Sequence, residues 1–149
     1  MASIFKSVEV TAGLKRYCAS GVYALYGHYT LAGSALVIND VIQMVNIPAG
    51  ARVLAVDLYV DRLDTGATPT ITLDVGDGVT TNLYITLAVV GQSAVGQVTS
   101  KTATYGQASA FAVSPYTSDD TIDILVHTAP QTGLTNSTVK LVALVSNDI

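Results

Sequence analysis

The chain has 149 residues, of which half are apolar and only 12% are charged, and its net charge is −4. Charged residues make up about a quarter of a typical soluble domain, so we expect other subunits to cover much of this apolar surface. The length fits one domain. The seven basic residues are scattered, which argues against nucleic-acid binding, and no segment has the roughly 18 to 20 apolar residues of a membrane helix.

The start of the chain is predicted to be an N-terminal arm over residues 1–16, followed by a single β-sandwich domain over residues 17–149. Gly13 weakens a helix in the arm, and the ends of domains are often loosely held, so an extended arm is expected. Exposed apolar side chains on such an arm often mark a partner site, and the only adjacent basic pair of the chain follows them. The candidate partner-binding residues are Ile4, Phe5, Val8, Lys15 and Arg16.

Residues 17–31 are rich in tyrosine, valine, leucine and small residues, a composition that suits a pleated strand. Gly27, in the middle of this strand, indicates a bulge or the close approach of another backbone. One predicted face carries Tyr23, Leu25, Gly27 and Tyr29, and the other carries Val22, Ala24, Tyr26 and His28.

Three apolar runs between Val37 and Gly78 form the centre of the chain. Pro48 and Gly50 end the first run, and Gly66 lies in the turn that ends the second. Alternation in the runs predicts strands, which we expect to pair as an antiparallel meander on which the rest packs. The inward side chains of the second and third runs are predicted to be Leu54, Val56, Leu58, Val60, Ile71, Leu73 and Val75.

Further short strands are predicted over residues 83–90, 110–113, 121–128 and 138–146, and residues 91–106 are predicted to form a loop or an exposed strand pair. No segment has sustained helical periodicity with capping residues. About eight to ten short strands predict an all-β, antiparallel, jelly-roll-like sandwich. The inward side chains of the last two strands are predicted to be Ile122, Ile124, Val126, Val139, Leu141, Ala143 and Val145.

Few residues are suited to catalysis. Cys18 and His28 are a possible thiol and base, but a free cysteine is most often a small buried side chain. His127 ends a predicted strand and is expected at the surface or in an interface. Metal-binding spacings of cysteine and histidine are absent. We therefore predict no catalytic residue, no cofactor and no metal ligand.

The aspartates allow one alternative to that prediction. Asp57, Asp61 and Asp64 are close in sequence, as are Asp74 and Asp77, and adjacent strand ends can gather carboxylates around a cation. The alternating ligand pattern of a calcium loop is missing from these segments. Aspartate and glycine also favour turns, and an outward aspartate keeps a strand soluble.

Two segments of the centre resemble a recurrent pattern in small structural proteins of tailed bacteriophages. They are DVIQMVNIPAGARVLAVDLYVD at residues 40–61 and LDTGATPTITLDVGDG at residues 63–78, and together they cover roughly a quarter of the chain. Some such proteins are capsid decoration, or cement, proteins with jelly-roll-like folds that sit as trimers on the head. The resemblance therefore implies a component of the virion. The first hypothesis is a trimeric cement protein on the capsid surface, made in the host cytoplasm, whose partners are the major capsid protein and further copies of itself.

Two other functions stay open at this point. The first is a subunit of the phage tail, such as a fibre, baseplate or head–tail adaptor protein. The second is a carbohydrate-binding β-sandwich, because the chain has eight tyrosines. It has no tryptophan, however, and Tyr23, Tyr26 and Tyr29 fall on both faces of their strand, which favours packing over a sugar site.

Overall fold

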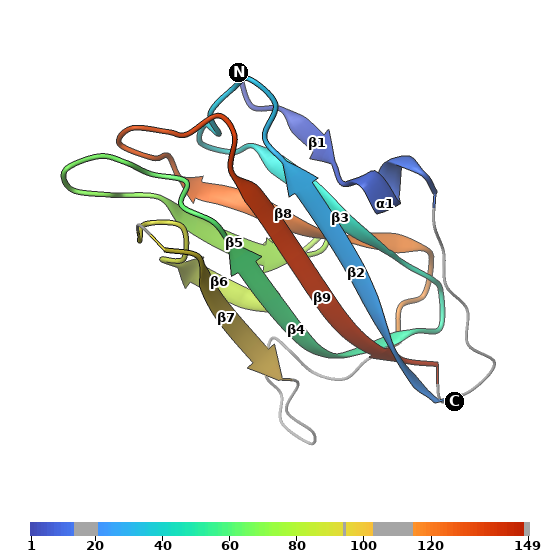
Figure 1. Cartoon of the computed structure of the whole chain (residues 1–149). Coiled ribbons are helices and arrows are strands. Elements are labelled where there is room, and N and C mark those ends of the chain that lie inside the picture. The colour runs from blue at the N-terminus through green and yellow to red at the C-terminus, as the bar shows by residue number, and fades with distance from the viewer. Residues whose placement is uncertain (14–20, 94, 103–114, 148–149) are drawn as a thin grey trace.

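The computed structural model describes residues 1–13, 21–93, 95–102 and 115–147. In this part of the chain nearly all regular structure is β-strand, with one short helix (Figure 1). The first elements are β1 (Ile4–Lys6), α1 (Val8–Thr11), β2 (Val22–Thr30), β3 (Val41–Ile47) and β4 (Arg52–Val60). The later elements are β5 (Thr72–Gly76), β6 (Ile85–Ala88), β7 (Gln97–Thr102), β8 (Asp120–Thr128) and β9 (Thr138–Ser146). The described residues include no helix long and apolar enough to cross a membrane.

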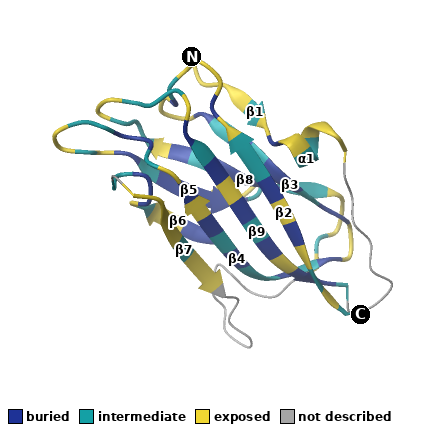
Figure 2. Ribbon diagram, viewed as in Figure 1, coloured by how far each residue is buried: buried dark blue, intermediate teal, exposed yellow. Residues whose placement is uncertain are grey.

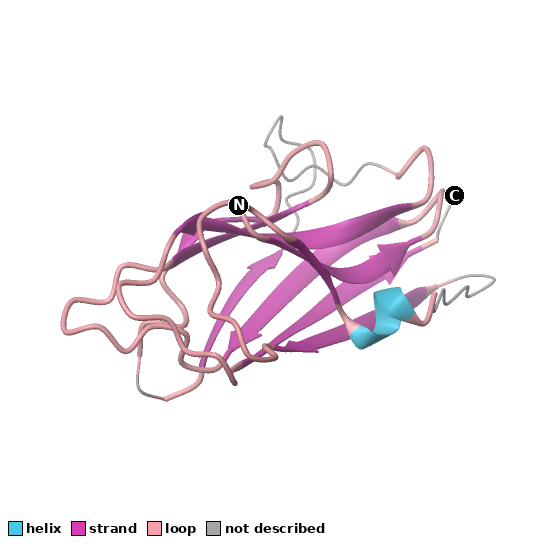
Figure 3. Ribbon diagram, turned by 90° about the horizontal axis from the view of Figure 1, so that it is seen from above, coloured by secondary structure: helices cyan, strands magenta, loops and turns pink. Residues whose placement is uncertain are grey.

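Two sheets pack face to face. The five-stranded sheet has the order β1-β3-β8-β5-β6, and the four-stranded sheet has the order β2-β9-β4-β7. The strand pairs are antiparallel, except that β1 runs parallel to β3. Seen from above in Figure 3, the sheets form two layers, with α1 at one side. The predicted all-β antiparallel sandwich is confirmed.

Alternating apolar side chains from both sheets fill the space between the layers. Successive side chains of a strand point to opposite faces. Alternate residues of a strand can therefore be buried while the residues between them face outward, as Figure 2 shows for β2, β9 and β4. The predicted inward faces of β8 and β9 are confirmed. Their fully buried members are Ile122, Ile124, Val126, Val139, Leu141, Ala143 and Val145.

The predicted central meander is wrong, although its three strands exist. β3 and β5 lie in the five-stranded sheet with β8 between them, and β4 lies in the four-stranded sheet. The chain therefore crosses from one layer to the other after β3 and again after β4. Alternation identifies the side of a strand that is buried, but it does not identify the strand that pairs with it, because any partner leaves the same face buried.

A bulge in β4 corrects one predicted inward residue. The pairing of β4 with β9 shifts register between Val53 and Ala55, so that Val53 is buried and Leu54 is only half-buried. A bulge inserts one extra residue and reverses the facing of what precedes it. Beyond the bulge the prediction holds, and the buried residues are Val56, Leu58 and Val60.

β5 buries residues on both of its faces. Its predicted inward residues are confirmed, but Asp74, expected to face solvent, is only 3% exposed. Asp74 accepts a hydrogen bond from the backbone N of Leu87 (2.6 Å) and pairs with Nδ1 of His127 (2.9 Å). The side chains facing the core are Ile71, Leu73 and Val75.

The two remaining strand predictions are met in part. β6 is shorter than the strand predicted over residues 83–90, and β7 forms an exposed edge strand within the segment predicted as a loop or strand pair. Residues 94 and 103–106 of that segment lie outside the described residues, as does the strand predicted over residues 110–113.

Candidate interaction surface

The four-stranded sheet exposes a broad set of apolar side chains on the side away from the core. Its strands bury one alternating set of residues (Figure 2), yet many of the outward residues are also apolar. Exposed apolar side chains normally occur singly, and contiguous groups mark interaction sites. We call this surface the outer sheet face. Its large members are Val22 (56% exposed), Tyr26 (48%), Tyr59 (42%), Val98 (54%) and Leu144 (39%), with Ala24, Ala55 and Val142 between them.

Strand register arranges the apolar side chains of the outer sheet face in two groups. Tyr26 of β2 is paired with Val142 of β9. Tyr59 of β4 lies between Lys140 of β9 and Val98 of β7. Side chains directly opposite each other on neighbouring strands are close enough to pack. The apolar groups on β2, β9 and the start of β4 therefore adjoin one another, while Tyr59 and Val98 form a second apolar group beside Asp57 and Lys140.

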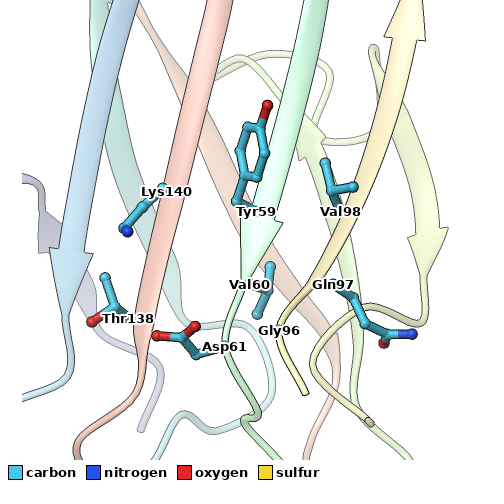
Figure 4. Close-up of a pocket in the computed structure, with 8 residues that line it drawn as sticks. All are labelled: Tyr59, Val60, Asp61, Gly96, Gln97, Val98, Thr138 and Lys140. Carbon is cyan, nitrogen blue, oxygen red and sulfur yellow. The ribbon is translucent and has the colours of Figure 1, made fainter.

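A groove of about 290 Å³ lies at one end of this face, as Figure 4 shows. Tyr59 and Val98 supply apolar wall, while Asp61 and Lys140 bring opposite charges from β4 and β9 (Figure 4). Apolar groups with a few charged groups at the rim are typical of protein–protein contacts. The full lining is Tyr59, Val60, Asp61, Gly96, Gln97, Val98, Thr138 and Lys140.

Ser7 fixes the N-terminal arm to the sandwich. Its side chain is fully buried, and its Oγ donates to the carbonyl oxygen of Met44 (2.6 Å) while its backbone N donates to the carbonyl of Gln43 (2.8 Å). The same Oγ accepts from the backbone N of Val10 (3.1 Å) and so caps α1. The expectation of a wholly extended arm is therefore wrong over Val8–Thr11, because a serine N-cap stabilises a single helical turn there.

Glu9 ties the same arm to the other sheet. Its Oε2 accepts a hydrogen bond from the backbone N of His28 in β2 (3.0 Å), and its Oε1 lies 2.9 Å from His28 Nδ1. Burial raises the pKa of Glu9. The hydrogen bonds at Glu9 and the charge of His28 lower this pKa by a larger amount, so it lies below its ordinary value. The arm is thus held on β3 of one sheet and on β2 of the other.

The described partner-binding residues of the arm differ in exposure. Ile4 is 69% exposed and Val8 is 57% exposed. Phe5 is half-buried and packs on Tyr29, with 5.5 Å between the ring centroids. Partner binding by this group stays a prediction. The two members that lie outside the described residues are Lys15 and Arg16.

The aspartates near the end of β4 have separate structural positions. Asp64 is fully buried, and its carboxylate ties the loop after β4 to the loop between β8 and β9. Burial raises the pKa of Asp64, but the backbone N–H donors outweigh burial and hold it well below its usual range. Across the described ranges, no three acidic, histidine or cysteine side chains gather as a metal site. The amides that donate to Asp64 are those of Gly66, Thr70, Ile71, Gln131 and Thr132.

The groups considered for catalysis have ordinary structural partners where they are described. His28 pairs with Glu9 beside α1, and His127 pairs with Asp74 beside β5, so each histidine is held by one carboxylate. Cys18 lies outside the described residues. The sequence prediction placed the interaction site on the arm and missed the outer sheet face. The signal for this face in the sequence was that inward and outward residues of β2 and β9 both include many apolar side chains.

Comparison with known proteins points to phage capsids. No family model and no curated protein matches this sequence. The structure is similar to a chain of the capsid of Ralstonia phage GP4, with a TM-score of 0.80 and 27% identity over 98% of this chain and 99% of that chain. It is also similar to a chain of the Cyanophage Pam1 capsid asymmetric unit, with a TM-score of 0.69 and 27% identity over 90% and 94% of the two chains.

A third chain shares the fold. It belongs to the acidic stable capsid structure of Helicobacter pylori bacteriophage KHP30 and matches with a TM-score of 0.52 and 23% identity, over 85% of this chain and 88% of that one. The two similarities at 27% identity support a structural, non-enzymatic protein of the bacteriophage virion that is a component of the capsid.

Proposed function

Taking the similarity to phage capsid chains as the premise, we propose that this chain is a capsid decoration, or cement, protein. It binds the outer surface of a bacteriophage head as a homotrimer and stabilises the lattice of the major capsid protein. The observation that carries the proposal is the coverage of the GP4 capsid chain, which is 98% of this chain and 99% of that one. The two chains therefore match over nearly their whole lengths, which supports a small separate subunit of the capsid.

The mechanism is linkage between binding and shell integrity. Any protein that binds the assembled lattice more tightly than the opened lattice stabilises the assembled form by mass action. Three linked copies bind more tightly than one, because the second and third attachments are intramolecular. A small sandwich without catalytic chemistry is sufficient for this role, provided that it presents one surface to its copies and another to the shell.

We assign the outer sheet face to the contact between copies. Permanent interfaces are more apolar than transient ones, and this face carries exposed apolar side chains on each of its four strands. The contact in a cyclic trimer is heterologous, so one part of this face meets a different part of the same face on the next copy around the threefold axis. The exposed residues Ile4 and Val8 of the arm lie beside β3 and β2 and are assigned to the shell contact, together with Lys15 and Arg16.

The capsid similarities favour the head over a tail fibre, baseplate or head–tail adaptor position. A carbohydrate-binding sandwich has less support, although Tyr26 and Tyr59 are exposed on the outer sheet face. Each tyrosine has an aliphatic neighbour on an adjacent strand, Val142 beside Tyr26 and Val98 beside Tyr59, which favours a protein contact. Binding of the purified protein to a sugar array would favour this second function.

The oligomeric state tests the assignment of the outer sheet face. Light scattering should give the mass of three copies for the wild type, and Leu144→Arg should shift the mass to that of one copy. Ile38→Arg is the matched control, because Ile38 is 53% exposed but lies outside the sheets. A wild-type monomer, or a Leu144→Arg variant that stays trimeric, would contradict the assignment.

Reattachment to particles tests the shell contact. Purified protein is added to heads that lack it, and the bound amount and the temperature of genome release are measured. The wild type should saturate the heads and raise the release temperature. A double variant, Ile4→Asp with Val8→Asp, keeps Ser7 and Glu9 and should bind more weakly. Equal binding of wild type and double variant would remove the arm from the shell contact.

A further inference from the structure

A hollow of about 260 Å³ lies on the other side of the molecule, on the outer face of the five-stranded sheet. We call it the Asp123 hollow. It is bounded by β1, β3 and β8 and by the loop that follows β5. The lining residues are Ile4, Val41, Gln43, Asp77, Gly78, Thr81, Asp123 and Leu125.

Asp123 lines this hollow, and one of its carboxylate oxygens is buried without a hydrogen-bond partner. Its neighbours Ile122 and Ile124 point into the core, so alternation directs Asp123 outward, yet it is only 8% exposed. Oδ1 of Asp123 has no hydrogen-bond partner, while a side-chain hydrogen bond from Thr121 reaches the carboxyl group. Gln43 Nε2 in turn lies 3.4 Å from Thr121 Oγ1. A buried acceptor of this kind is uncommon and calls for a partner.

The surroundings of Asp123 carry the same sign of charge. The pKa of Asp123 is raised to about 6: burial is the largest cause, the charges of Asp120 and Asp77 add to it, and the hydrogen bond from Thr121 opposes it. Asp77 is held in place because its Oδ1 accepts from the backbone N atoms of Val79 and Thr80. No lysine or arginine is among the described residues that line the hollow. A positive charge entering it would relieve this repulsion.

The residues that line the hollow fit a basic side chain better than a metal ion. Ile4, Val41 and Leu125 are apolar and surround the carboxylates, which suits the aliphatic stem of a basic side chain that carries its charge at the end. A metal ion fits less well, because within the described ranges no three suitable ligands converge. A planar guanidinium offers several donors to a carboxylate.

We propose that the Asp123 hollow receives an arginine side chain of the major capsid protein, with its guanidinium on the carboxylate of Asp123 and its stem against Ile4 and Leu125. This deepens the proposed function and rests on it, because it names the chemistry of the shell contact beside the arm. The five-stranded sheet then faces the shell, and the outer sheet face of the four-stranded sheet is left for the contact between copies.

The hollow is tested first without the capsid. Nα-acetyl-arginine methylamide is titrated into the ¹⁵N-labelled full chain at pH 7.5, with Nα-acetyl-citrulline methylamide as the neutral probe of the same shape. The arginine probe should shift the amides of Ile4, Gln43, Thr81 and Asp123 with an affinity about tenfold or more above that of citrulline. Asp123→Asn should abolish the difference. Equal affinities for the two probes, or shifts elsewhere, would overturn the proposal.

Reattachment to heads then tests the occupant. Asp123→Asn should weaken binding about tenfold or more, because a charge-assisted hydrogen bond is lost, while the control Asp119→Asn, at an exposed position that does not line the hollow, should bind like the wild type. If the wild type and Asp123→Asn saturate the heads with equal affinity, the arginine proposal fails and the decoration function stands. If the wild type itself does not bind heads, the decoration function fails, and the probe titration still decides whether the hollow accepts a guanidinium.

Discussion

Gly27 of β2 lies directly against the backbone of Met44 of β3, at a point where the two sheets come close together. A Cβ atom on Gly27 would be 2.1 Å from the carbonyl oxygen of Met44 and 2.8 Å from its carbonyl carbon. The β3 ladder shifts register between Gln43 and Val45, and the Met44 carbonyl accepts the Ser7 hydroxyl. The close approach predicted for Gly27 is confirmed, and it leaves no space for a side chain.

Gly27→Ala should therefore destabilise the fold by more than about 3 kcal/mol, at or beyond the upper end of the usual overpacking range, because the obstacle is backbone. Urea unfolding followed by circular dichroism measures the change. Gly78→Ala is the control, since its Cβ would meet only Asp120 Oδ1 at 3.6 Å. Similar unfolding free energies for the two variants would show that the sheets can separate at Gly27 without loss.

Leu58→Ala should reduce the free energy of unfolding by about 2 to 5 kcal/mol, because it leaves a cavity between the two sheets. Leu58 is fully buried in β4, whereas Leu144, in the neighbouring strand β9, is 39% exposed. Leu144→Ala should change the stability of the dissociated chain by less than about 1 kcal/mol. A loss below about 0.5 kcal/mol for Leu58→Ala would contradict the facing of β4.

Asp64 should make stability depend on acid. Its folded pKa lies far below the ordinary value of 3.8, so its contribution is fully present above the unfolded pKa and is lost as the pH falls through the folded pKa. Asp64→Asn should be about 3 kcal/mol less stable at pH 7, and the difference should narrow below pH 3.8. Asp61→Asn should match the wild type. Chemical unfolding between pH 7 and pH 2 measures both differences.

If the difference in unfolding free energy between the wild type and Asp64→Asn stays constant from pH 7 to pH 2, the charge of the buried carboxylate does not stabilise the fold. The effect would then come from the shape of the loop alone, since an amide and a carboxyl group have nearly the same size.

Asp123 should have the opposite pH dependence. Its folded pKa is raised to about 6 from 3.8, by burial and by Asp120 and Asp77, so the folded state binds the proton more tightly and loses stability as the pH rises through this window. Asp123→Asn should be more stable than the wild type at pH 8, on the order of 2 kcal/mol. The gain should disappear below pH 3.8. A variant less stable than the wild type at pH 8 would mean that the carboxylate has an internal partner.

The sequence predicts the buried face of each strand well and the pairing between strands poorly, for a physical reason. Ile122 and Val139 could be placed in the core because alternation in β8 and β9 follows directly from strand geometry. The pairing of β3 with β8 brings together Ile42 and Ile124, which are far apart in sequence, and no local pattern records that contact. The bulge at Leu54 was missed for the same reason, since it depends on the partner strand.

The interaction surfaces were predictable only in part. Ile4 and Val8 were recognised from an exposed apolar segment, and they are exposed in the folded chain. The Asp123 hollow could not be found from sequence, because it joins β1, β3, β8 and a distant loop. Its only local signal was an aspartate between two core isoleucines, a pattern that is equally typical of a solvent-facing position.

A three-dimensional image reconstruction of the whole particle tests the central claim most directly. The proposal predicts density for this sandwich as trimers on the outside of the head, with the five-stranded sheet toward the shell and the outer sheet faces in contact around the threefold axis. Density for the sandwich within the continuous shell itself, or in the tail, would contradict it.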